Sequence, residues 1–137
     1  MKDKSIILEE AKKEQQSGNY QKALDLLKQI FDIDDYFVSF EYAKTLYSLK
    51  KYEEAINIFL TLNEKNKEDK TVIDFVIKCY RESDNTTELI KFVETNDVID
   101  SNALLEIAET FFIDRKYNTA INFYEQYVEK NKEVKIQ

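Results

Sequence analysis

The residue types that most often carry out catalysis or hold metal ions are scarce in this sequence. Among its 137 residues it has no His, one Cys and one Gly. Without His, the commonest general base and the commonest zinc ligand are both missing. A single Gly cannot form a glycine-rich phosphate-binding loop. We therefore expect no enzyme activity, no cofactor and no metal site within these residues.

Paired carboxylates are the remaining candidates for general acid–base chemistry. The acidic pairs are all adjacent in sequence: Glu9–Glu10, Asp34–Asp35 and Glu53–Glu54. Adjacent side chains do not share a helix face, so the two carboxylates of a pair cannot converge on one substrate. Solvated surface charge, or charge near a helix N-terminus, is the simpler interpretation.

The lone Cys79 lies in a segment of apolar periodicity. We interpret it as a buried, inert thiol rather than a nucleophile. A single Cys cannot form an internal disulfide, and we expect a reduced, cytoplasmic setting. The N-terminal segment has only three consecutive apolar residues, and no stretch approaches membrane-spanning length. This predicts no secretory signal and no membrane interaction.

The net charge is −7. Binding to nucleic acid requires a basic surface that neutralises phosphates, so we expect no nucleic-acid partner. The chain has no Pro, which together with the single Gly favours helices over turn-rich β structure. Its length suits one domain with a modest core.

The elements that position the side chains are indicated by a repeated pattern of small and aromatic residues. An Ala is followed nine residues later by a Tyr and twelve residues later by a second Ala, in three copies: Ala11/Tyr20/Ala23, Ala43/Tyr52/Ala55 and Ala108/Tyr117/Ala120. A degenerate copy has Ile77 and Leu89 at the two Ala positions. Apolar residues then continue at helical spacing, as in Ile56, Phe59 and Leu62 after Ala55. Each copy therefore predicts two helices joined by a short corner.

This pattern resembles the tetratricopeptide repeat family. The first members of the four copies are spaced by 32, 34 and 31 residues, close to the family period of about 34 residues. Gly18 and Tyr20 fit the family pattern at the first corner, but the other corners lack Gly, and the Trp and Pro of the family pattern are absent. The resemblance is therefore to the packing positions and not to the turn chemistry.

The resemblance implies an all-α fold, an α-solenoid of about four stacked antiparallel helix pairs that form a right-handed superhelix. We expect a single domain over residues 1–137, since no linker divides the chain. The expected repeats and tail are 4–35, 36–69, 70–100, 101–131 and 132–137. A two-helix repeat cannot bury its apolar face alone, so neighbouring repeats must stack.

The resemblance also implies where a ligand would bind. In this family the first helix of each repeat lines the concave wall, and ligand-facing side chains come from the second, fifth, ninth and twelfth positions of the repeat. From these positions we select basic and aromatic residues as the candidate partner-binding site: Lys12, Phe37, Phe40, Lys44, Tyr47, Lys78, Arg81 and Phe112.

Our hypothesis is that this groove binds an extended peptide or partner-protein segment with acidic and apolar side chains. The lysines would provide attraction, and the aromatic rings would provide anchoring area. The simpler alternative is that these lysines are ordinary solvated charges on helices rich in Lys and Glu. The leading prediction is a non-enzymatic scaffold for protein–protein interaction.

The end of the array suggests a different function. The last predicted helix carries Ile121, Tyr124, Tyr127 and Val128, and no further helix follows to cover them. A repeat array normally finishes with a polar capping helix. An uncapped apolar edge fits a homodimer formed through this C-terminal helix pair, and hence a self-associating structural module. It also fits a chain that is the tetratricopeptide repeat portion of a larger multidomain protein.

Overall fold

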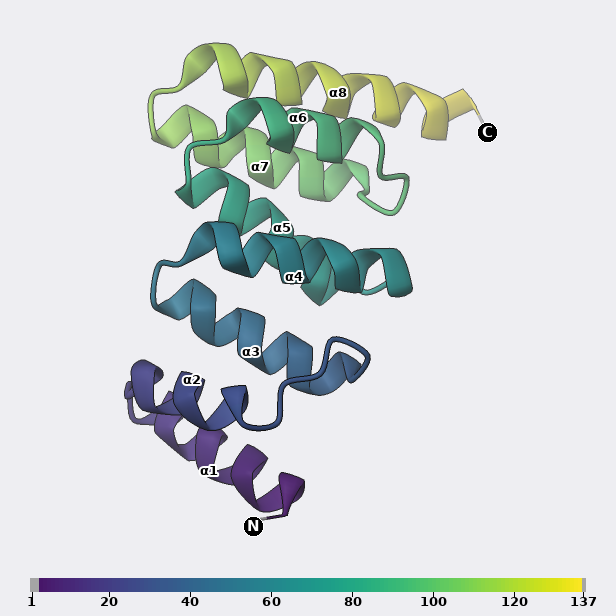
Figure 1. Ribbon diagram of the computed structural model, residues 1–137. Helices are drawn as coiled ribbons and strands as arrows, with labels where there is room; N and C mark the ends of the chain where they lie inside the picture. Colours follow the sequence, from purple (N-terminus) through teal and green to yellow (C-terminus); the bar gives the residue numbers. More distant parts are fainter. Residues whose placement is uncertain (1–2, 137) are drawn as a thin grey trace. The chain divides into compact units, whose positions relative to one another are not determined.

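The computed structural model describes residues 3–136, and side chains are described for residues 3–132. The described residues form eight α-helices and no strand (Figure 1): α1 (Lys4–Gln16), α2 (Tyr20–Lys28), α3 (Tyr36–Ser48), α4 (Tyr52–Lys65), α5 (Lys70–Glu82), α6 (Thr86–Glu94), α7 (Ser101–Ile113) and α8 (Tyr117–Ile136). We call the odd-numbered helices A helices and the even-numbered helices B helices. The all-α solenoid of antiparallel helix pairs predicted from the sequence is confirmed at the level of fold class.

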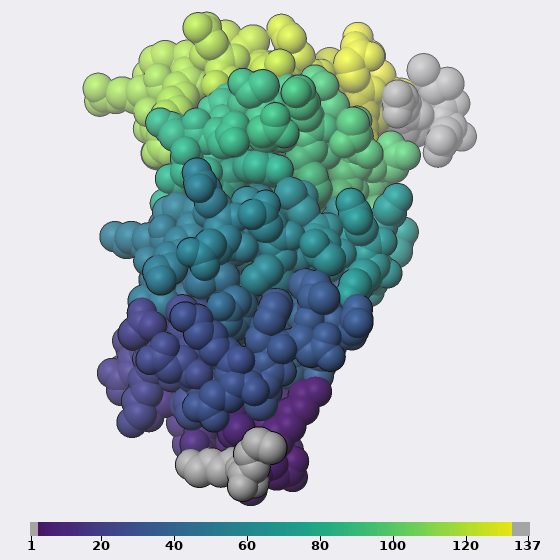
Figure 2. Space-filling model, in the orientation of Figure 1, coloured from purple at the N-terminus to yellow at the C-terminus, as the bar shows by residue number. Residues whose placement is uncertain are grey.

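The chain divides into two compact units. Unit 1 spans Met1–Asn85 and contains α1 to α5, and unit 2 spans Thr86–Gln137 and contains α6 to α8. In unit 1, α1 packs on α2, α2 on α3, α3 on α4 and α4 on α5, while in unit 2 α7 packs on α8. Side chains fill the spaces between the ribbons of unit 1 (Figure 2).

Every A helix begins at the same position of its repeat, because an Asp precedes it. The side chains of Asp3, Asp35, Asp69 and Asp100 each accept a hydrogen bond from a backbone N–H in the first turn of the helix that follows. This N-cap supplies a partner for an N–H group that the helix itself cannot satisfy. Lys4 pairs with Asp35, and its hydrogen bond lowers the pKa of that carboxyl group.

The corner between the A and B helices has one geometry in all four repeats. The fifteenth residue of each repeat has a positive φ: 79° at Gly18, 63° at Lys50, 59° at Asp84 and 64° at Arg115. The next residue donates its N–H to a carbonyl five residues back, as from Asn19 to Glu14 at 2.8 Å. This is the Schellman arrangement that ends a helix. The later corners lack the Gly of the family pattern, as the sequence analysis noted, and they nevertheless keep the same backbone geometry.

The small residues of the repeat lie between packed helices. Ala11 is 1% exposed, and Ala43 and Ala108 are fully buried, as are Ala23, Ala55 and Ala120. Because Ala has no side chain beyond Cβ, the A and B helices of a pair can approach closely at these positions. Phe59, Phe111 and Phe123 fill the space beside them and are the largest fully buried side chains.

The predicted tail at 132–137 continues α8 as far as Ile136, and residue 137 lies outside the described residues. Among the helices that the structure describes, none is long and apolar enough to cross a bilayer. Cys79 is 1% exposed, and burial raises the pKa of its thiol to about 12. A thiol with such a pKa stays protonated at neutral pH, as expected for an inert core residue.

Candidate functional site

The A helices of unit 1 are in direct contact with one another. The side-chain amide of Gln15 on α1 donates a 2.6 Å hydrogen bond to the hydroxyl of Thr45 on α3. The rings of Tyr47 on α3 and Phe75 on α5 have centroids 5.5 Å apart. Helices α1, α3 and α5 therefore form a continuous wall. We call the side chains of its second, fifth, ninth and twelfth repeat positions, together with Phe75, the A-helix face of unit 1.

A lysine from each helix of this face lies over an aromatic ring. The Nζ of Lys12 is 4.7 Å from the ring centroid of Phe37, and the Nζ of Lys78 is 5.1 Å from that of Phe75. The Nζ of Lys44 is 5.8 Å from the centroid of Phe40. Each distance is within the range of a cation–π interaction. The rings therefore hold ammonium groups close to apolar surface.

Phe75 was not among the residues selected from the sequence. It occupies the sixth position of its repeat, which the family pattern does not assign to ligand contact. The signal that could have found it is its spacing, because residues three apart on a helix share a face and Phe75 is three residues before Lys78.

Phe40, Tyr47 and Phe75 form a half-buried aromatic cluster in the middle of the face. The rings of Phe40 and Phe75 meet edge to face with centroids 5.7 Å apart, and the fully buried Phe59 stacks under Phe75 at 4.9 Å. Burial raises the pKa of the Tyr47 hydroxyl. The cluster is anchored in the core from below and leaves part of each ring at the surface.

The three lysines differ in their ion pairs. The Nζ of Lys44 is 3.1 Å from a carboxylate oxygen of Glu41, whose side chain is almost fully buried. Lys44 is therefore already neutralised within the protein. Among the described residues, neither Lys12 nor Lys78 has an acidic side chain within ion-pair distance, and the same is true of the half-buried Arg81.

The charge of this face is opposite to that of the whole protein. It carries four basic side chains, while Asp74 and the adjacent Glu41 are its acidic ones. The complete chain has a net charge of −7. A locally positive surface on an acidic protein attracts negatively charged partners and leaves the rest of the molecule repulsive to them.

Phe112 belongs to unit 2, whereas the other seven candidate residues belong to unit 1. Its side chain on α7 is 54% exposed, and its ring centroid is 5.5 Å from that of Tyr117. Seven of the eight selected residues thus belong to the wall of α1, α3 and α5.

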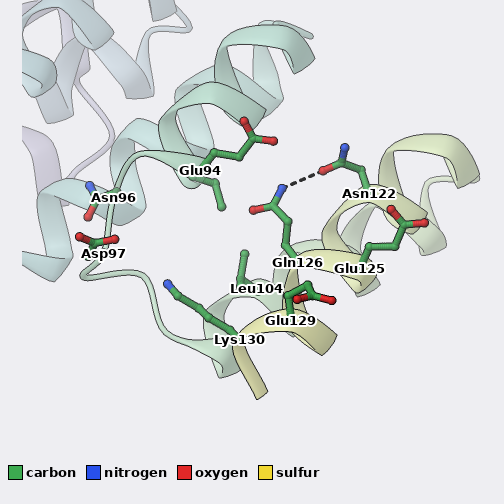
Figure 3. Close-up of a pocket in the computed structure, with 10 residues that line it drawn as sticks. Glu94, Asn96, Asp97, Leu104, Asn122, Glu125, Gln126, Glu129 and Lys130 are labelled. Atoms are coloured by element: carbon green, nitrogen blue, oxygen red, sulfur yellow. Dashed lines mark hydrogen bonds between the residues drawn. The ribbon is translucent and has the colours of Figure 1, made fainter. Parts of the chain in front are cut away.

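Unit 2 contains a hollow that the sequence analysis did not predict. It has a volume of about 430 Å³ and lies between the end of α6, the start of α7 and α8 (Figure 3). Its apolar floor includes Val93 and Leu104. Its polar lining consists of Glu94, Asn96, Asp97, Asn122, Glu125, Gln126, Glu129 and Lys130. The lining residues come from three segments that are separate in the sequence: 93–97, 104 and 122–130.

The polar groups of this hollow are partly satisfied by one another. Gln126 donates a 2.7 Å hydrogen bond to Asn122 one turn earlier on α8 (Figure 3). Lys130 extends to the connecting loop and donates to the carbonyl of Ile99. No group of His, Cys, Asp and Glu among the described residues is arranged to hold a metal ion.

A second surface of unit 2 is apolar. Ile121, Tyr124 and Val128 line a shallow hollow of about 420 Å³ on α8, together with Glu125 and Glu129. Ile121 is 52% exposed and Val128 is 47% exposed. Residues at the repeat positions of Ile121 and Tyr124 are fully buried in α2, where Leu24 and Leu27 lie under the contact with α3. The exposed Ile121 and the half-buried Tyr124 on α8 therefore occupy repeat positions whose side chains are buried in α2.

Residues 15–74 match the family model described as the tetratricopeptide repeat. This segment is therefore similar to the tetratricopeptide repeat family. The match includes the packing positions Ala23, Ala43 and Ala55 and reaches α5, so the resemblance predicted from the residues is confirmed.

Solved structures extend the likeness of fold beyond this segment. MamA 41-end from Desulfovibrio magneticus RS-1 superposes with a TM-score of 0.69 at 12% identity, covering 96% of this chain and 77% of that one. MamA MSR-1 superposes with a TM-score of 0.70 at 15% identity, covering 97% of this chain and 79% of that one. At such low identity the tetratricopeptide-type helical fold is shared, and nothing follows about shared partners. No curated protein matches this chain in sequence.

Proposed function

We propose that this tetratricopeptide repeat protein is a non-enzymatic scaffold whose A-helix face in unit 1 binds an extended segment of a partner protein. The segment carries acidic and apolar side chains. The observation that supports this most directly is the row of lysines held over aromatic rings on a protein of net charge −7. An ammonium group attracts a carboxylate, and an adjacent ring packs against an apolar side chain.

The placement of the lysines favours a binding face over the alternative that they are ordinary solvated charges. A Lys side chain on a helix surface can extend into water, yet these ammonium groups lie within 4.7–5.8 Å of ring centroids. The rings also keep part of their area at the surface: Phe37 is 47% exposed. Exposed aromatic area beside positive charge is typical of binding hot spots.

A titration with labelled peptides tests this function. A peptide of mixed Glu and Leu should raise fluorescence anisotropy on addition of the protein, and a matched peptide with Gln in place of Glu should bind several-fold more weakly. Raising the salt concentration from about 50 mM to about 500 mM should reduce the affinity of the Glu peptide, because exposed charges are screened. Equal affinity of the two peptides, or no salt dependence, would contradict the proposal.

Self-association through α8 is a second candidate function. The apolar stripe of Ile121, Tyr124 and Val128 supports it, because the equivalent surface of α2 is covered by a neighbouring helix. A second copy of this chain, presenting the same stripe, would cover it in a symmetric dimer. Glu125 and Glu129 would then lie at the edge of the contact, where their charges stay in water.

A further inference from the structure

The A-helix face of unit 1 has unequal charges along its length. Its positive groups without an ion pair in the described residues are Lys12 on α1 and Lys78 and Arg81 on α5, and of these the two lysines lie over aromatic rings. Lys44, between them, is held by the buried carboxylate of Glu41 at 3.1 Å. A bound carboxylate would have to displace Glu41, which has almost no access to solvent and would lose its only ion-pair partner in the described structure. The middle of the face is therefore a poor site for an acidic side chain.

The middle of the face is instead aromatic. Phe40 and Tyr47 from α3 contact Phe75 from α5, and all three rings are half-buried. Binding of an apolar side chain to this surface is favourable, because it removes the exposed part of each ring from water. The order across the wall is a positive group, an apolar patch and a second positive group.

Helix geometry gives the distance between the two positive groups. Packed helices lie about 8–10 Å apart, so two steps across the wall, from α1 through α3 to α5, span about 16–20 Å. An extended peptide advances about 3.3 Å per residue. Crossing from Lys12 to Lys78 therefore takes about five to six residues.

We propose that this face selects extended segments in which two acidic side chains lie about five or six residues apart, with an apolar side chain midway between them. The acidic groups pair with Lys12 and Lys78, and the apolar group lies on the cluster of Phe40, Tyr47 and Phe75. The proposal rests on the proposed function of this face and adds the spacing of the motif that it recognises.

Two synthetic peptides of identical length and composition test the spacing. One has two Glu at the proposed interval with Leu midway, and the other has the two Glu adjacent. The spaced peptide should bind about two- to fivefold more tightly, because it alone can form both exposed ion pairs at once. In the double variant Lys12→Gln/Lys78→Gln this preference should disappear. The matched double variant Lys28→Gln/Lys67→Gln makes the same charge change at exposed sites outside the face and should keep it.

Each result has a definite meaning. Equal affinity of the two peptides for the unsubstituted protein overturns the spacing and leaves the proposed function standing. Binding of neither peptide overturns both. A preference that persists in Lys12→Gln/Lys78→Gln overturns the assignment of the two acidic groups to these lysines.

Discussion

At the scale of single residues, one pair combines stability with specificity. Glu41 on α3 is 5% exposed, and Lys44, one turn later, is the cation that faces it at 3.1 Å. A buried carboxylate without a partner is costly, because it has lost its hydration. The pair thus keeps a charged group in the wall of the array and also removes Lys44 from the charges available to a ligand.

Replacing Lys44 should therefore destabilise the protein more than replacing Lys12. We expect Lys44→Ala to lower the free energy of unfolding by about 1–2 kcal/mol, since Glu41 is left unpaired while Lys44 itself is partly screened by solvent. Lys12→Ala, which removes a similar contact with a ring but no ion pair, should cost less than about 1 kcal/mol. Urea unfolding followed by circular dichroism measures both. Equal losses for the two variants would show that the Glu41–Lys44 pair contributes nothing.

At the scale of elements, the repeat is defined by its corner. All four A helices end with the fifteenth repeat residue in the left-handed region, although only Gly18 is a residue that adopts this φ without strain. Asp is tolerated there, but Lys50 and Arg115 pay a steric cost from Cβ. The left-handed conformation is kept at these corners because the hydrogen bonds of the Schellman arrangement and the packing of the buried Ala residues stabilise it.

Glycine at the strained corners should stabilise the protein. We expect Lys50→Gly and Arg115→Gly each to raise the free energy of unfolding by about 0.5–1 kcal/mol, because the left-handed φ then carries no Cβ penalty. Gly18→Ala should lower it by about 1 kcal/mol. A Cβ at position 18 would meet no atom within 4 Å, so this loss would come from the backbone conformation alone.

Chemical denaturation of the three variants and the unsubstituted protein checks these signs. A loss of stability in both Lys50→Gly and Arg115→Gly would mean that their side chains contribute more than the left-handed backbone costs.

At the scale of the whole molecule, the feature that bears on self-association is the apolar stripe of Ile121, Tyr124 and Val128 on α8. Ile121 and Val128 are about half exposed, whereas Leu24, which occupies the repeat position of Ile121 in α2, is fully buried. Exposed apolar stripes of this kind on a repeat array favour association. A symmetric contact would close after two copies.

We therefore expect a dimer that a single charge on α8 disrupts. Multi-angle light scattering should give about twice the 16.3 kDa chain mass for the unsubstituted protein at high concentration, and the single-chain mass for Ile121→Lys. Ile6→Lys is the matched control, since Ile6 is 49% exposed against 52% for Ile121 and lies on α1. A single-chain mass for the unsubstituted protein at every concentration would rule out this association.

The sequence alone determined the helix pairs of this protein, because the signals for them are local. These signals are small residues at twelve-residue intervals, an Asp before each A helix and a Tyr at the start of three B helices. The resemblance to the tetratricopeptide repeat family, through the repeat positions that it implies for ligand contact, also led to eight candidate residues, of which seven lie on α1, α3 and α5. Only the tertiary structure decided which of those residues are available to a partner. Glu41 neutralises Lys44, Phe75 joins the aromatic cluster, and the hollow between α6 and α8 forms from three separate segments. These features depend on side-chain contacts between residues far apart in the sequence or on burial, and no local spacing encodes either.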